Sequence, residues 1–353
     1  DRPESEMASD QPTQGRTIRP NPKRQVILVA LALMGLAIGY GLGFVFKPSP
    51  APPVVKSESA APVKSQSAPP SRGRTGAPAR TKERGSVGLW LIGLGPGDLG
   101  LMTRSATEAA RSCDKRYLEG YTAVLPANQE EALEGVVGSW ERLMRPSIES
   151  PSALMEEARA SAVALMVVGD PLQATTHVDL EAWCSESGVN FHVEPGISAT
   201  SLAVSASGLQ PYRFGRQVTI PYRYGEYLAT SPLEMIEGNH SRGLHTLVLL
   251  DLDPSGMGIE RPTPMKPNEA VSLIESMAEK CVEEGVGGRF AESSIMEWNG
   301  FLLSDLGTDS QRVLSGSLGE LSNIGTGFVH TLIIPADMSE NEKEAFERRR
   351  PHR

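Results

Sequence analysis

The hydrophobic residues form one long uninterrupted run near the start of the chain and many short runs after residue 85. The long run, residues 25–46, reads QVILVALALMGLAIGYGLGFVF and contains no charged residue. Roughly 20 apolar residues in a helix span the ~30 Å hydrocarbon core of a bilayer. Cleaved signal peptides usually have a shorter apolar run, and a helix that is apolar on every side is rare in soluble domains. The pattern therefore predicts a single transmembrane helix at 25–46.

Two segments of different composition flank this run. Residues 1–24 are polar, with charges of both signs and several prolines, which predicts a disordered tail. Residues 47–85 are rich in Pro, Ala and Ser, a composition typical of a partly extended linker. The predicted order along the chain is tail, membrane helix, linker and then a folded part that begins near residue 86.

Short apolar runs alternate with helical patterns in the first half of the folded part. A run of about six apolar residues bounded by glycines is typical of a buried strand, because a helix of that length is rare. Thr103 is an expected helix N-cap, and the helix after it would bury Ala106, Ala109 and Ala110. Strands are expected at 87–94, 117–118, 162–168 and 190–193, and helices at 103–113, 178–187 and 197–206.

The second half shows a similar alternation. Strands are expected at 217–220, 245–252, 301–303 and 328–334, and helices at 232–239 and 268–284. The last segment, 339–353, is a charged tail that fits either a short amphiphilic helix or disorder. Alternating strands and helices indicate the α/β class with a mainly parallel sheet.

Charge and cysteine content exclude several function classes. The net charge is −9, whereas a nucleic-acid-binding protein needs a basic face. Cys113, Cys184 and Cys281 are far apart and form no C-x-x-C pair, so neither a zinc site nor a disulfide framework is predicted. None of the six histidines has the spacing of a metal site. We therefore expect neither a nucleic-acid partner nor a metal.

Four loops with unusual chemistry follow the predicted strands. In open α/β sheets, ligands bind beyond the carboxyl ends of the strands. The glycines of the first loop let backbone approach a ligand, but the loop is neither a G-x-G-x-x-G nor a P-loop motif. Asp170 could accept hydrogen bonds from a ligand or could simply cap the next helix, and the sequence leaves both open. The loops are 93–98, 169–171, 194–198 and 250–251.

Several strings around these loops resemble the diphthine synthases, which are members of the tetrapyrrole methylase (class III methyltransferase) superfamily. The resemblance extends over nearly all of the chain after Gly85. The strings are GLWLIGLG (88–95), CDKRYLEGYTAVL (113–125), GDPLQATTHVDL (169–180), GLQPYRFGR (208–216), SRGLHTLVLLD (241–251), NEA (268–270) and GTGFVHTLIIP (325–335).

The resemblance implies a fold, an activity and partners. It implies two α/β subdomains, 86–211 and 212–338, with a cofactor cleft between them, usually in a homodimer. It implies S-adenosylmethionine as methyl donor and translation elongation factor 2 as protein substrate. The amino group of the 3-amino-3-carboxypropyl-histidine of that factor would be methylated to give diphthine, a step of diphthamide biosynthesis. Both reactants are cytosolic, which places the catalytic domain on the cytosolic side of any membrane anchor.

The resemblance also implies a set of cofactor contacts and no particular catalytic residue. Asp170 would be the polar anchor, while Leu250 and Leu306 would wall the adenine and His330 would reach the adenine or the sugar. The implied cofactor-binding residues are Pro96, Asp170, Gln173, Gly196, Ile197, Leu250, Leu306 and His330.

Three segments depart from the pattern of the diphthine synthases. Pro96-Gly97-Asp98 resembles the corrin methylases instead, and Gly196 replaces the serine of Pro-Ser-Ile. In the segment 303–308, Asp305 stands in place of an arginine. These departures keep two alternatives open, a methylase of a small tetrapyrrole or corrin and a membrane-tethered inactive homologue.

Overall fold

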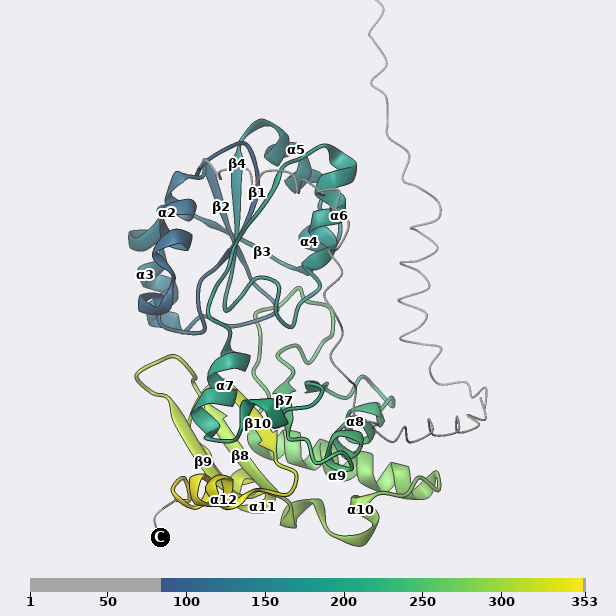
Figure 1. Cartoon of the computed structure of the whole chain (residues 1–353). Coiled ribbons are helices and arrows are strands. Elements are labelled where there is room, and N and C mark those ends of the chain that lie inside the picture. Colours follow the sequence, from purple (N-terminus) through teal and green to yellow (C-terminus); the bar gives the residue numbers. More distant parts are fainter. Residues whose placement is uncertain (1–83, 352–353) are drawn as a thin grey trace, which may run out of the picture. The chain divides into compact units, whose positions relative to one another are not determined.

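The computed structural model describes residues 84–351, drawn in colour in Figure 1. The predicted tail 1–24, the predicted membrane helix 25–46 and nearly all of the predicted linker 47–85 lie outside the described residues. None of the helices in the described part is long and apolar enough to span a bilayer.

The first sheet contains five parallel strands in the order β3-β2-β4-β1-β5. The central strands β1 and β4 are buried along their whole length, as expected for a parallel sheet covered on both faces. The strands are β1 Gly88–Gly93, β2 Lys115–Glu119, β3 Glu141–Leu143, β4 Ala162–Val167 and β5 Phe191–Glu194.

Two groups of helices cover the faces of this sheet (Figure 1). Successive side chains of a strand point to opposite faces, so Trp90 and Ile92 share a core with α2 and α3, whereas Leu89 and Leu91 share one with α5 and α6. Thr103 caps α2 by accepting a hydrogen bond from the Ala106 N–H, as predicted. The helices are α2 Arg104–Ser112, α3 Ala127–Val137, α4 Arg145–Glu149, α5 Ser152–Ala160 and α6 Val178–Ser187.

The second sheet is mixed, with the order β6-β7-β10-β8-β9. Only β6 and β7 pair in parallel, and the other neighbours are antiparallel. The prediction of a mainly parallel sheet is therefore wrong for this half, because β8 and β9 are joined directly without a crossover helix and β10 inserts between β7 and β8. The strands are β6 Val218–Ile220, β7 Thr246–Leu250, β8 Asn299–Ser304, β9 Arg312–Ser317 and β10 His330–Ile334.

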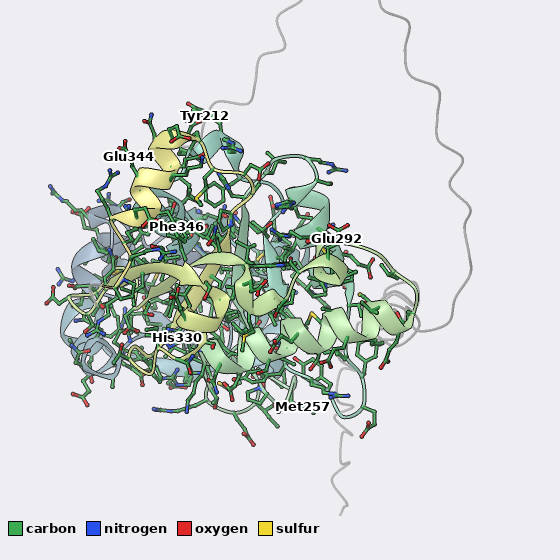
Figure 2. The ribbon with its side chains drawn as sticks, turned by 90° about the horizontal axis from the view of Figure 1, so that it is seen from below. Tyr212, Met257, Glu292, His330, Glu344 and Phe346 are labelled. Carbon is green, nitrogen blue, oxygen red and sulfur yellow. The ribbon has the colours of Figure 1, made fainter. Side chains whose placement is uncertain are left out.

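Helices α8, α9 and α11 share one core with this sheet, and α7 and α12 share another. The predicted charged tail contains α12, whose Phe346 ring meets the Phe301 ring edge-on at 5.2 Å between centroids. Figure 2 labels Phe346, which is buried, and Glu344 on the exposed side of the same helix. Helix α7, which lies within the predicted first subdomain, shares a core with the second sheet. The division into subdomains 86–211 and 212–338 stays a prediction. The helices are α7 Ala199–Ser207, α8 Ser231–His240, α9 Pro267–Glu283, α10 Arg289–Glu292, α11 Leu318–Ser322 and α12 Glu340–Glu347.

Candidate active site

A cavity of about 540 Å³ lies where the carboxyl ends of the first sheet meet the second sheet. The loops after β1, β2, β4 and β5 form one side. The ends of β7 and β8 and the start of β10 form the other. All four loops that the sequence singled out contribute residues, as the strand-end rule predicts.

Glycines allow three of these loops to cross in backbone contact. Gly95 and Gly169 exchange two backbone hydrogen bonds, of 2.7 and 3.2 Å. A Cβ atom added to Gly196 would lie only 2.1 Å from the carbonyl oxygen of Gly169 and 2.9 Å from the Gly93 Cα. Glycine at 196, where the diphthine synthase pattern has serine, is therefore what this loop crossing requires.

Asp170 ties two of the crossing loops together. Its Oδ1 accepts a hydrogen bond from the Leu172 N–H at 3.0 Å, which stabilises the turn after β4. Its Oδ2 accepts one from the Gly196 N–H at 3.1 Å, which holds the loop after β5. The same carboxylate lines the cavity, so the turn-forming role and the ligand-facing position coincide.

The opposite wall of the cavity combines apolar side chains with aspartates. Leu250 and Leu306 line it, together with Val329, which immediately precedes β10. His330 also lines it, and its Nδ1 lies 2.8 Å from the Ser304 hydroxyl oxygen. Burial lowers the pKa of His330 below its usual value, so this ring is neutral at pH 7.

Asp305 braces the loop that carries Leu306. Its carboxylate accepts hydrogen bonds from the N–H groups of Phe328 and Val329, both at 2.9 Å. Its backbone has φ 51°, a left-handed conformation that Asp adopts more readily than most side chains. The aspartate that replaces the family arginine therefore joins the end of β8 to the segment before β10.

Two of the three departures from the family pattern touch each other. The Asp98 N–H donates to the Gly307 carbonyl at 2.9 Å. A Cβ atom at Gly307 would lie 2.5 Å from Cγ of Pro96. The Pro96-Gly97-Asp98 loop and the 303–308 segment are thus one structural unit at the edge of the cavity.

Comparisons with known proteins agree with this geometry. The family model of the tetrapyrrole (corrin/porphyrin) methylases matches residues 88–322. The chain belongs to this family. It is 32% identical over 263 residues to a diphthine synthase from Methanocorpusculum labreanum, covering 74% of this chain and 98% of that protein.

Two further relatives place the chain among the diphthine synthases within the tetrapyrrole methylases. A diphthine methyl ester synthase from Mus musculus is 31% identical over 259 residues, covering 70% of this chain and 90% of that protein. A crystal structure of a diphthine synthase, 26% identical, superposes with a TM-score of 0.62 and covers 74% of this chain and 95% of that one. The chain is therefore a methyltransferase of the diphthine synthase group.

Six of the eight residues that the resemblance implies for the cofactor lie together in this tetrapyrrole methylase cavity. They are Pro96, Asp170, Gln173, Leu250, Leu306 and His330. Gly196 and Ile197 are not among the lining residues, but they immediately precede Ser198 and Ala199, which are. Contact of these eight residues with a cofactor stays a prediction.

Sequence reasoning missed several charged and aromatic residues of the cavity. Arg145 was not a candidate, because it follows a three-residue strand that carries no clear pattern. Tyr121 stands in one of the matching strings, 113–125, but no motif marks it as a cavity residue. The lining contains six aspartates, namely Asp98, Asp170, Asp251, Asp253, Asp305 and Asp309.

Proposed function

We propose that this methyltransferase transfers methyl groups from S-adenosylmethionine to the amino group of the 3-amino-3-carboxypropyl-histidine of translation elongation factor 2, giving diphthine. The observation that carries this proposal is the acidic cavity at the strand ends of a chain from the diphthine synthase group. Carboxylates in the lining attract both the positively charged methyl donor and the amino group of the acceptor.

The cavity fits the donor in size and in chemistry. Its volume of about 540 Å³ lies within the ~300–1,000 Å³ range of small-molecule sites. Leu250 and Leu306 offer an apolar surface for the adenine, and Asp170 offers a carboxylate for polar groups. We propose that the eight residues implied by the family hold the donor, namely Pro96, Asp170, Gln173, Gly196, Ile197, Leu250, Leu306 and His330.

The residues of the cavity orient the two reactants and form no covalent bond with either of them. S-adenosylmethionine supplies a methyl group on a positively charged sulfur, which an amine displaces in line, so correct placement supplies much of the rate. Tyr121 and Phe328 present aromatic rings to the cavity. Aromatic faces stabilise quaternary ammonium groups, which suits an amine that gains methyl groups.

Asp251 holds the cavity wall and is a poor candidate for removing the amine proton. Its carboxylate accepts hydrogen bonds from the N–H groups of Tyr222, Leu252 and Asp253 and from the Tyr224 hydroxyl. Each of its two oxygens already accepts two hydrogen bonds, so neither is free to take the amine proton. We assign Asp251 to shaping the wall and to attracting positive charge.

The acidic lining also disfavours the alternative of a small tetrapyrrole substrate. Tetrapyrrole precursors carry several carboxylates, and six aspartates in the lining would repel them. The named relatives point the same way.

The proposal includes an assembly and a location. We propose a homodimer whose catalytic part works in the cytosol, where donor and elongation factor occur, with residues 25–46 as a membrane anchor. Light scattering of the purified chain would test the dimer. Protease protection of the N-terminal segment in sealed vesicles would test the anchor and its orientation.

Labelled methyl transfer tests the reaction itself. The full chain is incubated with methyl-labelled S-adenosylmethionine and elongation factor 2 that carries the unmethylated 3-amino-3-carboxypropyl group. We expect label on the factor, and mass spectrometry of the modified peptide would count the methyl groups and show whether the carboxylate is also esterified. A factor that stays unlabelled, although the enzyme binds the donor, would contradict the proposal.

Asp170 provides a test of the donor site. Asp170→Ala removes the acceptor for the Gly196 N–H and a cavity carboxylate, so we expect affinity for S-adenosylhomocysteine to fall about tenfold or more. Isothermal titration calorimetry measures this. Asp179→Ala, at an exposed position on α6, is the matched control and should bind normally. Equal affinity of the two variants would remove Asp170 from the site.

A further inference from the structure

Among the described residues that line the cavity, Arg145 is the only arginine or lysine. The same lining contains six aspartates. His330, the other basic residue of the lining, is kept neutral by burial. The cavity therefore has one positively charged position in an otherwise acidic wall.

The Arg145 side chain is held in place but only partly used by the protein. Its backbone N–H donates to the Gly258 carbonyl at 3.0 Å, and its Nη1 donates to the Gly256 carbonyl at 3.3 Å. Its Cζ lies 5.1 Å from the centre of the Tyr121 ring. The Nε atom is buried and has no hydrogen-bond partner among residues 84–351. A guanidinium has five N–H donors, so this one has donors to spare.

The carboxylates that interact electrostatically with Arg145 accept hydrogen bonds from other groups or lie at the edge of ion-pair distance. Glu119 accepts hydrogen bonds from the Tyr121 and Thr122 N–H groups and from the Thr122 hydroxyl. Asp253 accepts from Ser255 and from the Gly258 N–H. Glu149 approaches the Nε atom only to 3.9 Å. These carboxylates support the charge of Arg145 without occupying its guanidinium in paired hydrogen bonds.

The acceptor in the proposed reaction needs a positively charged side chain in the cavity. Its side chain carries an amino group and a carboxylate on the same carbon. The aspartates attract the amino group but repel the carboxylate, which requires a cationic partner to enter the cavity. Arginine presents parallel N–H groups that match the two oxygens of a carboxylate.

We propose that Arg145 binds the carboxylate of the 3-amino-3-carboxypropyl side chain and so directs its amino group toward the methyl donor. This assignment rests on the function proposed above. It makes Arg145 a substrate-binding residue that the family motifs in the sequence did not indicate.

The donor also carries an amino-acid carboxylate, and position favours the acceptor. The Arg145 side chain is 34% exposed, whereas Leu250, Leu306 and His330, the residues expected at the adenine end of the donor, are at most 8% exposed. A protein-borne side chain must enter from solvent, so the exposed rim of the cavity suits the acceptor and the buried part suits the donor.

The test compares Arg145 variants of the full chain. Arg145→Met and Arg145→Gln remove the charge, and we expect kcat/KM for the elongation factor to fall about 10- to 100-fold. Arg145→Lys keeps the charge and should recover part of the loss. Arg261→Met is the matched control, because Arg261 lies on the neighbouring loop, is 78% exposed and is absent from the cavity lining.

Calorimetry separates the two sources of a carboxylate. S-adenosylhomocysteine carries the amino-acid carboxylate of the donor, and methylthioadenosine lacks it. We expect both to bind Arg145→Met as they bind the wild type, which also shows that the variant folds. A loss of affinity confined to S-adenosylhomocysteine would assign Arg145 to the donor and overturn the proposal.

Two further results are distinguishable. If the wild type is active and Arg145→Met and Arg145→Gln keep its kcat/KM, the role of Arg145 is overturned and the proposed function is not. A wild type that methylates no elongation factor would overturn the proposed function and this inference together.

Discussion

Single residues at the loop crossing show how a departure from a family pattern can be structural. Gly196 occupies a position where a hydroxyl is usual, but its backbone passes directly over the Gly169 carbonyl. Asp305 replaces an arginine and accepts backbone hydrogen bonds from the segment before β10. Both replacements have a structural role in this chain, although the one at 305 reverses a charge in the cavity lining. The alternative of an inactive homologue therefore gains no support from these two positions.

A serine at position 196 tests this explanation. Gly196→Ser places a Cβ atom 2.1 Å from the Gly169 carbonyl oxygen, and the loops must separate to accept it. Overpacking of this kind costs about 1–3 kcal/mol, which urea unfolding measures. Gly225→Ser is the control, because no atom lies within 4 Å of its added Cβ, although its φ of 59° adds some strain. A Gly196→Ser variant as stable as the wild type, with tighter donor binding, would contradict the explanation.

Among the elements, α12 shows how a charged terminal segment becomes part of the core. Glu342 is 1% exposed and accepts hydrogen bonds from the Gln210 N–H and the His245 ring. The Arg213 guanidinium also donates to it. His245 accepts a hydrogen bond from the Ala336 N–H through Nδ1, so its Nε2 carries the hydrogen and donates the hydrogen bond to Glu342. One carboxylate thus connects α12 with the start of the second sheet.

Acid should weaken this connection in a defined pH window. Burial alone would raise the pKa of Glu342, but hydrogen bonds from Gln210, Ser339 and His245 lower it from 4.5 to about 2. A lowered carboxylate pKa stabilises the fold above the unfolded value and loses that contribution as pH falls from about 4.5 to about 2. The contribution at pH 7 is on the order of 3 kcal/mol.

Glu342→Gln should therefore be less stable than the wild type at pH 7, and the difference should shrink below pH 4.5. Denaturant unfolding across this pH range measures both. Glu344→Gln, on the exposed side of α12 in Figure 2, should leave stability unchanged. A wild-type-like pH profile for Glu342→Gln would assign the stability of α12 to its apolar contacts alone.

At the scale of the whole folded part, the cavity joins two sheets with separate cores. Strand-end loops of the first sheet form one side of the cavity, and β7, β8 and β10 of the second sheet form the other. Contacts such as Asp98 with Gly307 and Arg145 with Gly256 cross between the halves beside the cavity. A ligand that fills the cavity should therefore stabilise both halves together.

S-adenosylhomocysteine at 100 times its Kd should add about 2.7 kcal/mol to the free energy of unfolding. For a folded part of this size the melting temperature should rise by roughly 5–10 °C. Differential scanning calorimetry should show one transition that shifts as a whole, and Asp170→Ala should reduce the shift. Two transitions, with only one displaced by the ligand, would show that the halves unfold independently.

Much of the fold and part of the site were predictable from the sequence. The apolar runs predicted β1 and β4, and the helical pattern at 178–187 matches α6. The glycine-rich and acidic loops at the strand ends predicted where a ligand site would form, and six expected donor residues do line the cavity. These predictions succeed because burial along a strand or helix and the position of its end depend on residues close together in the chain.

Tertiary structure alone determined the remaining features. The insertion of β10 between β7 and β8, the docking of α12 and the place of Arg145 in the cavity all join residues far apart in sequence. No local pattern marks Arg145, because its role follows from which loop of the second sheet lies beside it. The amino-acid sequence by itself determined the family, the strand ends and the loops that line the cavity. Packing between the two sheets decided the charge of the cavity, because that charge is a sum over loops that only the folded chain brings together.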